Sequence, residues 1–200
     1  MTSSVDTTGD ATDRFPHAAD VPVVSFFPRT EPSMPVHVPE VDRAPCGYPA
    51  VVVAVRRTTV APADAVWAVL GDGWRLGSWV VGAARVDAVD EAWPAVGAGL
   101  RYGIGAWPAI VPGVAMVTAC RPGHELALHG RTPFGGVDVR VTVEPAGQDT
   151  GSAGSVLCIA EDVVSGPARL VPARLRATAI GARNVETLRR LTLLAEAPAP

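Results

Sequence analysis

The chain has 200 residues, a formal net charge of −3 at pH 7, 48% hydrophobic residues and 18% charged residues. This composition is typical of a globular protein, and the length fits one domain of about 150 residues plus an extension. Because nucleic-acid-binding domains carry clustered basic charge, the acidic balance argues against DNA or RNA as a partner.

The N-terminal sequence, the lengths of the apolar runs and the cysteine spacing together predict a cytoplasmic protein. Three acidic residues occur by Asp13, so the N-terminus lacks the apolar segment of a secretory signal. No run approaches the ~18 apolar residues that a membrane span requires. Cys46, Cys120 and Cys158 show no CxxC spacing, which favours free thiols in a reducing compartment over a disulfide framework or a zinc site.

Residues 1–47 differ from the rest of the chain. They contain seven prolines and seven acidic residues but only three arginines. Prolines at this density interrupt helices and central strands, so we expect an acidic arm that is flexible. The apolar stretch at residues 23–27 supports the alternative that the arm lies on the domain surface or covers a pocket mouth.

A first strand is predicted at residues 50–59, followed by two short helices. Pro62 suits the first position of one helix and Gly71 its C-terminal cap. Asp72 can cap a second helix over residues 73–78. Trp79 follows this helix, either as a core anchor or as part of a pocket lining.

From Gly82 onward the sequence alternates between strand-like segments and turns. Pro and Gly mark most of the turns, one of them at Pro112-Gly113. Short strands at regular spacing predict an antiparallel meander. The six candidates are residues 84–89, 96–105, 114–120, 125–131, 137–144 and 155–163. With the first strand they make a seven-stranded sheet, so the fold class is α+β.

The C-terminal segment predicts one long amphipathic helix that ends near Glu196. Steps of three and four residues place eight small or apolar positions on one face: Leu170, Ala173, Ala177, Ile180, Asn184, Leu188, Leu191 and Ala195. The opposite face is charged, and Glu186 can pair there with Arg190 and Arg183. The apolar face is expected to pack on the sheet and to leave a pocket between them.

Several segments together resemble the START-like, or polyketide cyclase/dehydrase, superfamily (SRPBCC). They are residues 60–70 with Asp72 and Trp79, Val96-Gly97, residues 122–128, Glu161-Asp162, Gly166-Pro167 and residues 183–191. The resemblance covers about residues 48–196. It implies the helix-grip fold, a curved seven-stranded antiparallel sheet that wraps around the C-terminal helix and encloses a hydrophobic cavity.

Strand alternation indicates which side chains face that cavity. Tyr102 shares its phase with Leu100 and Ile104, and Glu161 shares its phase with Leu157 and Ile159. Asn184 interrupts the apolar face of the helix. Two structural alternatives stay open: Glu161 is solvated at the end of its strand, and Asn184 forms a hydrogen bond to the sheet.

The resemblance also suggests chemistry, because aromatase/cyclases of this superfamily use a pocket arginine with Tyr, Trp and Ser/Thr groups to polarise the carbonyls of a poly-β-ketone. The corresponding set here is Trp79, Tyr102, Thr118 and an arginine. Arg131 faces outward by alternation, unless a bulge near Gly130 reverses it. No arginine is clearly inward, which weakens the case for catalysis.

Three functions follow as hypotheses. The first is binding of a small hydrophobic ligand, aromatic or polyketide-like, by side chains that include Trp79, Tyr102, Thr118, Arg131, Glu161 and Asn184. The second is a polyketide aromatase/cyclase or dehydrase that uses Glu161 and Tyr102 as acid–base groups. The third is a protein-interaction module. No metal site or cofactor is predicted, since HExxH, GxSxG and GxGxxG are absent, and homodimer formation is left open.

Overall fold

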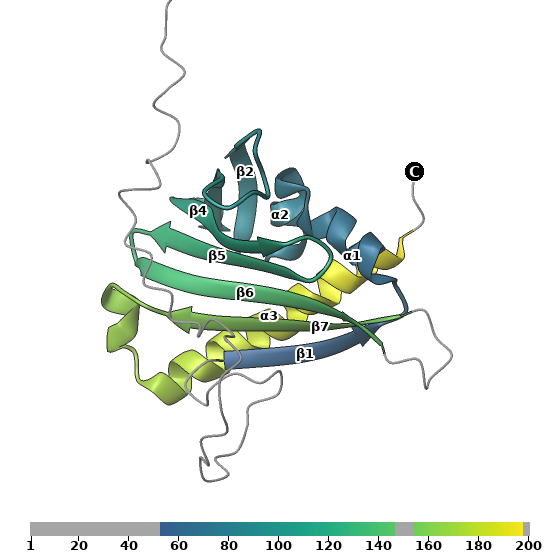
Figure 1. Ribbon diagram of the computed structural model, residues 1–200. Coiled ribbons are helices and arrows are strands. Elements are labelled where there is room, and N and C mark those ends of the chain that lie inside the picture. The colour runs from purple at the N-terminus through teal and green to yellow at the C-terminus, as the bar shows by residue number, and fades with distance from the viewer. Residues whose placement is uncertain (1–52, 147–153, 198–200) are drawn as a thin grey trace, which may run out of the picture. The chain divides into compact units, whose positions relative to one another are not determined.

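The computed structural model describes residues 53–146 and 154–197. The predicted arm, residues 1–47, lies outside this part of the chain and stays a prediction. The described residues form a seven-stranded antiparallel sheet with a long C-terminal helix (Figure 1). The strands are β1 Val53–Thr59, β2 Ala83–Val89, β3 Gly99–Ala106, β4 Ala109–Arg121, β5 Glu125–Thr132, β6 Gly135–Pro145 and β7 Ser155–Val163.

The strand order is β1-β7-β6-β5-β4-β3-β2, so the last six strands form a meander and the first strand pairs with the last. The predicted α+β class and antiparallel sheet are confirmed. Helix α3, Ala173–Glu196, crosses one face of the sheet (Figure 1) and packs on β1, β7 and the two short α-helices. The sheet and α3 together enclose the region that carries the site.

The two short helices after β1 have the predicted caps at Gly71 and Asp72. Pro62, however, is the N-cap of the first helix and not its first residue, and Trp79 ends the second helix instead of following it. Helix α1, Ala63–Leu70, ends at Gly71, whose N–H donates to the Trp67 carbonyl at 2.7 Å. The second helix consists of a 3-10 turn, η3 Gly73–Arg75, continued by α2, Leu76–Trp79. Asp72 caps it, because its carboxylate accepts a hydrogen bond from the Trp74 N–H at 3.0 Å.

The turn predicted at Pro112-Gly113 is wrong, since both residues lie inside β4 and the chain reverses at residues 107–108. Pro112 is tolerated because the pairing of β4 with β5 begins only at Val114. The preceding part of β4 pairs with β3 alone, and a proline there removes no hydrogen bond that a central strand would need.

The core lies between the sheet and α3. Six leucines are almost completely buried there: Leu70, Leu100, Leu126, Leu157, Leu188 and Leu191. The alternation predicted for β3, β5 and β6 agrees with the burial of Leu100, Leu126 and Val141. Among the described residues, no helix is long and apolar enough to cross a membrane.

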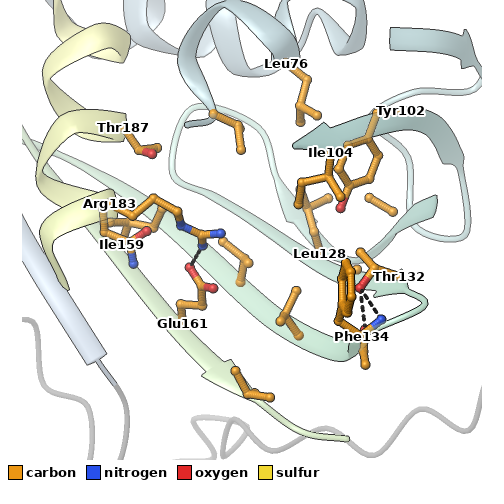
Figure 2. A pocket seen from close by; sticks show the side chains of 18 of the residues that line it. Leu76, Tyr102, Ile104, Leu128, Thr132, Phe134, Ile159, Glu161, Arg183 and Thr187 are labelled. Carbon is orange, nitrogen blue, oxygen red and sulfur yellow. Dashed lines mark hydrogen bonds and ion pairs between the residues drawn. The ribbon is translucent and has the colours of Figure 1, made fainter. Parts of the chain in front are cut away.

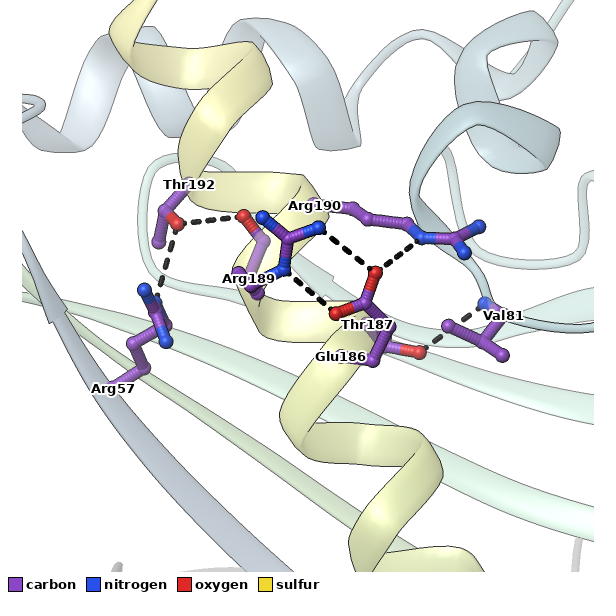
Figure 3. Close-up of polar contacts among 7 residues, drawn as sticks. All are labelled: Arg57, Val81, Glu186, Thr187, Arg189, Arg190 and Thr192. Atoms are coloured by element: carbon purple, nitrogen blue, oxygen red, sulfur yellow. Dashed lines mark hydrogen bonds and ion pairs between the residues drawn. The ribbon is translucent and has the colours of Figure 1, made fainter.

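The outer side of α3 carries a cluster of ion pairs (Figure 3). Glu186 binds Arg190 at 2.9 Å, as predicted, but its second partner is Arg189 at 2.7 Å and not Arg183. Thr192, by contrast, is buried, and its hydroxyl accepts a hydrogen bond from Arg57 of β1 at 3.3 Å. Arg183 does not take part because it belongs to the cavity side of the helix.

The two described cysteines differ. Cys120 is free and half-buried, whereas Cys158 is a disulfide cysteine. The prediction of free thiols is therefore wrong for Cys158. The spacing of cysteines along a sequence does not by itself tell which of them form disulfides.

Candidate ligand-binding cavity

A cavity of about 230 Å³ lies between the sheet, α2 and α3. Most of its wall is apolar, and it is formed from strands β3 to β7 together with the helices. Representative wall residues are Leu76, Ala115, Leu128, Val139, Ile159 and Val163. Strand alternation explains this lining, because every second side chain of each strand faces α3.

Arg183 and Glu161 form an ion pair in this wall (Figure 2). Glu161, on β7, is only 2% exposed, and β7 continues past it to Val163. The alternative of a solvated carboxylate at a strand end is therefore wrong. Arg183 reaches the carboxylate from α3, so its predicted position on the charged face of the helix is also wrong.

The position of Arg183 follows from helix geometry. Thr187 and Leu191 are buried on α3, and Arg183 precedes them by four and eight residues, which places all three along one stripe. The sequence contained this signal, but the charge of Arg183 suggested a solvent-facing side chain. Strand alternation predicted no inward-facing arginine. Arg183 is such an arginine, and it comes from helix α3 and not from a strand.

Asn184 is fully buried and is part of the cavity lining. Neither its side-chain oxygen nor its side-chain nitrogen has a hydrogen-bond partner among the described residues. The alternative of a structural hydrogen bond to the sheet is therefore wrong. Thr187 also lines the cavity but, unlike Asn184, it has a partner, because its hydroxyl accepts a hydrogen bond from the Val81 N–H at 3.2 Å (Figure 3).

Tyr102 faces Arg183 from the opposite wall (Figure 2). Two glycines on neighbouring strands make room for its ring: a Cβ on Gly113 would lie 3.0 Å from Cζ, and one on Gly130 would lie 3.6 Å from the hydroxyl oxygen. Burial raises the pKa of Tyr102, an effect that Arg183 opposes and Glu161 reinforces. The phenol is therefore neutral at pH 7 and can donate a hydrogen bond.

The other residues predicted to bind ligand divide into two groups. Trp79 is 2% exposed and contributes to the cavity wall. Thr118 and Arg131 lie outside the lining. Thr118 falls at the register shift of β4 against β5, and Arg131 is exposed because β5 pairs regularly with β6 through Gly130, so no bulge reverses its direction.

One end of the cavity is bordered by the β5–β6 turn and the segment that follows β7. Phe134 is 57% exposed there, and both Phe134 and Ala168 of η5, Pro167–Leu170, line the cavity. The two segments are joined by backbone hydrogen bonds, including Gly136 N–H to the Ser165 carbonyl at 3.2 Å and Ala168 N–H to the Phe134 carbonyl at 3.3 Å.

The comparisons with known proteins support this architecture. No family model and no curated protein matches the chain. Solved structures do match: the aromatase/cyclase ZhuI from Streptomyces sp. R1128 aligns with a TM-score of 0.57 and 19% identity, covering 72% of this chain and 93% of that one. The chain has the helix-grip fold.

Two further structures share the helix-grip fold. Protein CV1439 from Chromobacterium violaceum aligns with a TM-score of 0.56 and 18% identity over 74% of this chain and 99% of that one. The di-domain aromatase/cyclase StfQ of the steffimycin biosynthetic pathway aligns with a TM-score of 0.56 and 14% identity over 72% of this chain and 51% of that one. At these identities the likeness establishes the fold, while function has to be argued from the cavity.

Proposed function

We propose that the protein binds a small hydrophobic molecule, aromatic or polyketide-like, in the cavity between the sheet and α3. The observation that carries this proposal is the composition of the wall. Apolar side chains surround a few polar groups: the buried Tyr102, Glu161 and Asn184 and the partly exposed Arg183. Ligand sites typically combine an apolar surface with a few placed polar groups that fix orientation.

Native mass spectrometry of the purified protein tests this proposal, together with titration of naphthalene and anthracene. A cavity-filling variant, Ala115→Phe, is compared with Ala109→Phe. Ala115 is buried in the cavity wall, whereas Ala109 is exposed on the same strand. We expect Ala115→Phe to weaken binding at least about tenfold while the protein stays folded. Equal binding by both variants would place the ligand elsewhere.

A second candidate, a polyketide aromatase/cyclase or dehydrase, is favoured by the groups that meet across the cavity. The Arg183 guanidinium can polarise a ligand carbonyl, the Glu161 carboxylate can accept a proton from carbon, and the neutral Tyr102 phenol can donate one to an oxygen. Groups in these roles typically contribute ~10²–10⁴-fold in rate. Solved aromatase/cyclases with the same fold support this candidate by analogy.

The catalytic candidate is tested with a synthetic linear triketone, whose cyclisation to a methylresorcinol forms one carbon–carbon bond and releases one water. Glu161→Gln is compared with Glu144→Gln, a change at an exposed position on β6. We expect turnover to fall about 100-fold or more with Glu161→Gln only. A wild-type rate equal to that in buffer leaves ligand binding as the function.

A further inference from the structure

The carboxamide of Asn184 stands out among the buried polar groups. A carboxamide offers two N–H donors on nitrogen and an acceptor on oxygen. Asn184 is 0% exposed, and neither atom has a partner among the described residues. Buried polar groups are almost always hydrogen-bonded, because leaving them unpaired is costly. Asn184 is among the residues that line the cavity, so a ligand that fills the cavity can supply this partner.

The nearest polar groups do not supply that partner. Arg183, the preceding residue, holds Glu161 through a terminal guanidinium nitrogen, and its Nε is buried without a partner among the described residues. The Thr187 hydroxyl, one helical turn away, receives the Val81 N–H. Among the described residues, the polar side-chain atoms of α3 in this wall that have no partner at all are Asn184 Oδ1, Asn184 Nδ2 and Arg183 Nε.

We propose that this wall recognises a neutral carbonyl group with an adjacent N–H or O–H, of which a lactam is the type. This inference rests on the proposed function and specifies the ligand's polar end. The ligand carbonyl accepts from Asn184 Nδ2–H while the ligand N–H donates to Asn184 Oδ1, the bidentate pairing that carboxamides make with adenine. Asn184 is then the specificity-determining residue of the cavity.

The ligand group is neutral because the charges around it already balance. Glu161 is 2% exposed and its carboxylate is compensated by Arg183. A second carboxylate beside Glu161, or a second cation beside Arg183, would be buried without a counter-ion, which is strongly unfavourable. A lactam satisfies the donor and the acceptor of Asn184 without adding charge.

Three two-ring probes of similar shape test the proposal by calorimetric titration. The lactam 2-quinolinone carries the complete group, 1-methyl-2-quinolinone retains the carbonyl but lacks the donor, and naphthalene has neither. For the wild-type protein we expect 2-quinolinone to bind about tenfold more tightly than either of the other two. Equal affinities for all three probes would overturn the proposal while leaving cavity binding intact, whereas no binding of any probe would overturn both.

The variant Asn184→Leu keeps the number and branching of the side-chain heavy atoms, and Val185→Ala, at the exposed neighbouring position, is its control. We expect Asn184→Leu to abolish the preference for 2-quinolinone, to tighten naphthalene binding and to raise the Tm of the ligand-free protein, because an unpaired buried amide is removed. Val185→Ala should keep the wild-type order of affinities. If Asn184→Leu lowers the Tm and weakens all three probes equally, the amide has a structural role and the proposal fails.

Discussion

The side chains of Arg183 and Glu161 form an ion pair that joins α3 to β7 across the wall of the cavity. The Glu161 side chain is 2% exposed and that of Arg183 is 31% exposed, so the pair is largely withdrawn from water. Such a pair holds the helix on the sheet and also places a cation and a carboxylate beside any ligand. Stability and the proposed function are therefore expected to depend on the same two residues.

Replacing Arg183 alone is expected to be strongly destabilising. Arg183→Leu leaves the buried Glu161 carboxylate without its counter-ion, which typically costs about 3–5 kcal/mol. Urea unfolding measures the loss, with Arg189→Leu as control because Arg189 is paired on the exposed side of the same helix. The double variant Glu161→Leu/Arg183→Leu should recover much of the loss. Equal effects of Arg183→Leu and Arg189→Leu would contradict this account.

The ionisation of Tyr102 should appear as a loss of stability at high pH. Burial raises its pKa in the folded protein above the ordinary value of 10.0. At pH values between 10.0 and this higher pKa, the unfolded chain has lost a proton that the folded chain retains. Stability from this group is complete below pH 10 and declines as pH rises toward the folded pKa. Tyr102→Phe should remove this component of the stability–pH curve, measured by unfolding at several pH values.

A direct check is the ultraviolet titration of the phenols. The chain has two tyrosines, and Tyr102→Phe leaves only Tyr48. The transition that disappears in this variant should be the one with a pKa above 10. Loss of a transition at or below pH 10 would show that the cavity does not keep the phenol neutral.

Glu186 should remain ionised in acid. Hydrogen bonds from Arg189 and then Arg190 lower its pKa from 4.5 to about 2. The stability that this carboxylate contributes is present above pH 4.5 and is lost as pH falls through about 2. Carbon-detected NMR of the carboxyl group measures the pKa directly. Because the pair is exposed, concentrated salt should move the pKa back toward 4.5, and a pKa insensitive to salt would argue against ion pairing as its cause.

The border of the cavity depends on two glycines that approach each other's backbone. Gly135 and Gly166 have φ of 136° and 84°, and a Cβ on Gly135 would lie 2.0 Å from the Ser165 carbonyl oxygen. Alanine at either position is therefore expected to destabilise the protein by more than the ~1 kcal/mol of strain alone. Gly123 is the matched control, since its φ is 77° but its Cβ would meet nothing within 4 Å. Thermal unfolding of the three alanine variants tests whether those at Gly135 and Gly166 lose more stability than the one at Gly123.

The contribution of α3 packing to stability can be measured by truncating two leucines of this helix. Leu188 is 0% exposed and Leu193 is 51% exposed. Leu188→Ala should cost about 2–5 kcal/mol because it leaves a cavity in a packed core. Leu193→Ala should change stability by less than about 0.5 kcal/mol. Similar losses for both would mean that α3 is not packed as described.

Periodicity along the chain predicted most of the fold. The steps of three and four residues predicted α3, but only its second half, from Asn184 to Ala195, is buried as expected. Leu170 lies outside the helix and is 86% exposed, and Ala173 and Ala177 are exposed as well. The helical steps of that half and the alternation in β3, β5 and β6 depend on which side chains leave water, and the sequence itself carries this information. The caps at Gly71 and Asp72 are equally local. The turn at Pro112-Gly113 was wrong because whether a proline interrupts a strand depends on which edges are paired, and pairing is decided by distant segments.

The candidate site was only partly predictable, because contacts between segments that are distant along the chain complete it. The sequence determined that Tyr102 and Glu161 share the phase of apolar neighbours and that Asn184 interrupts the helix face. Only the tertiary structure decided that Arg183 turns inward. A cation that is largely withdrawn from water is stable only where a carboxylate meets it, and Glu161 lies 22 residues away along the chain. The tertiary structure also decided that Asn184 finds no partner, since hydrogen bonding of a buried group depends on every element packed around it.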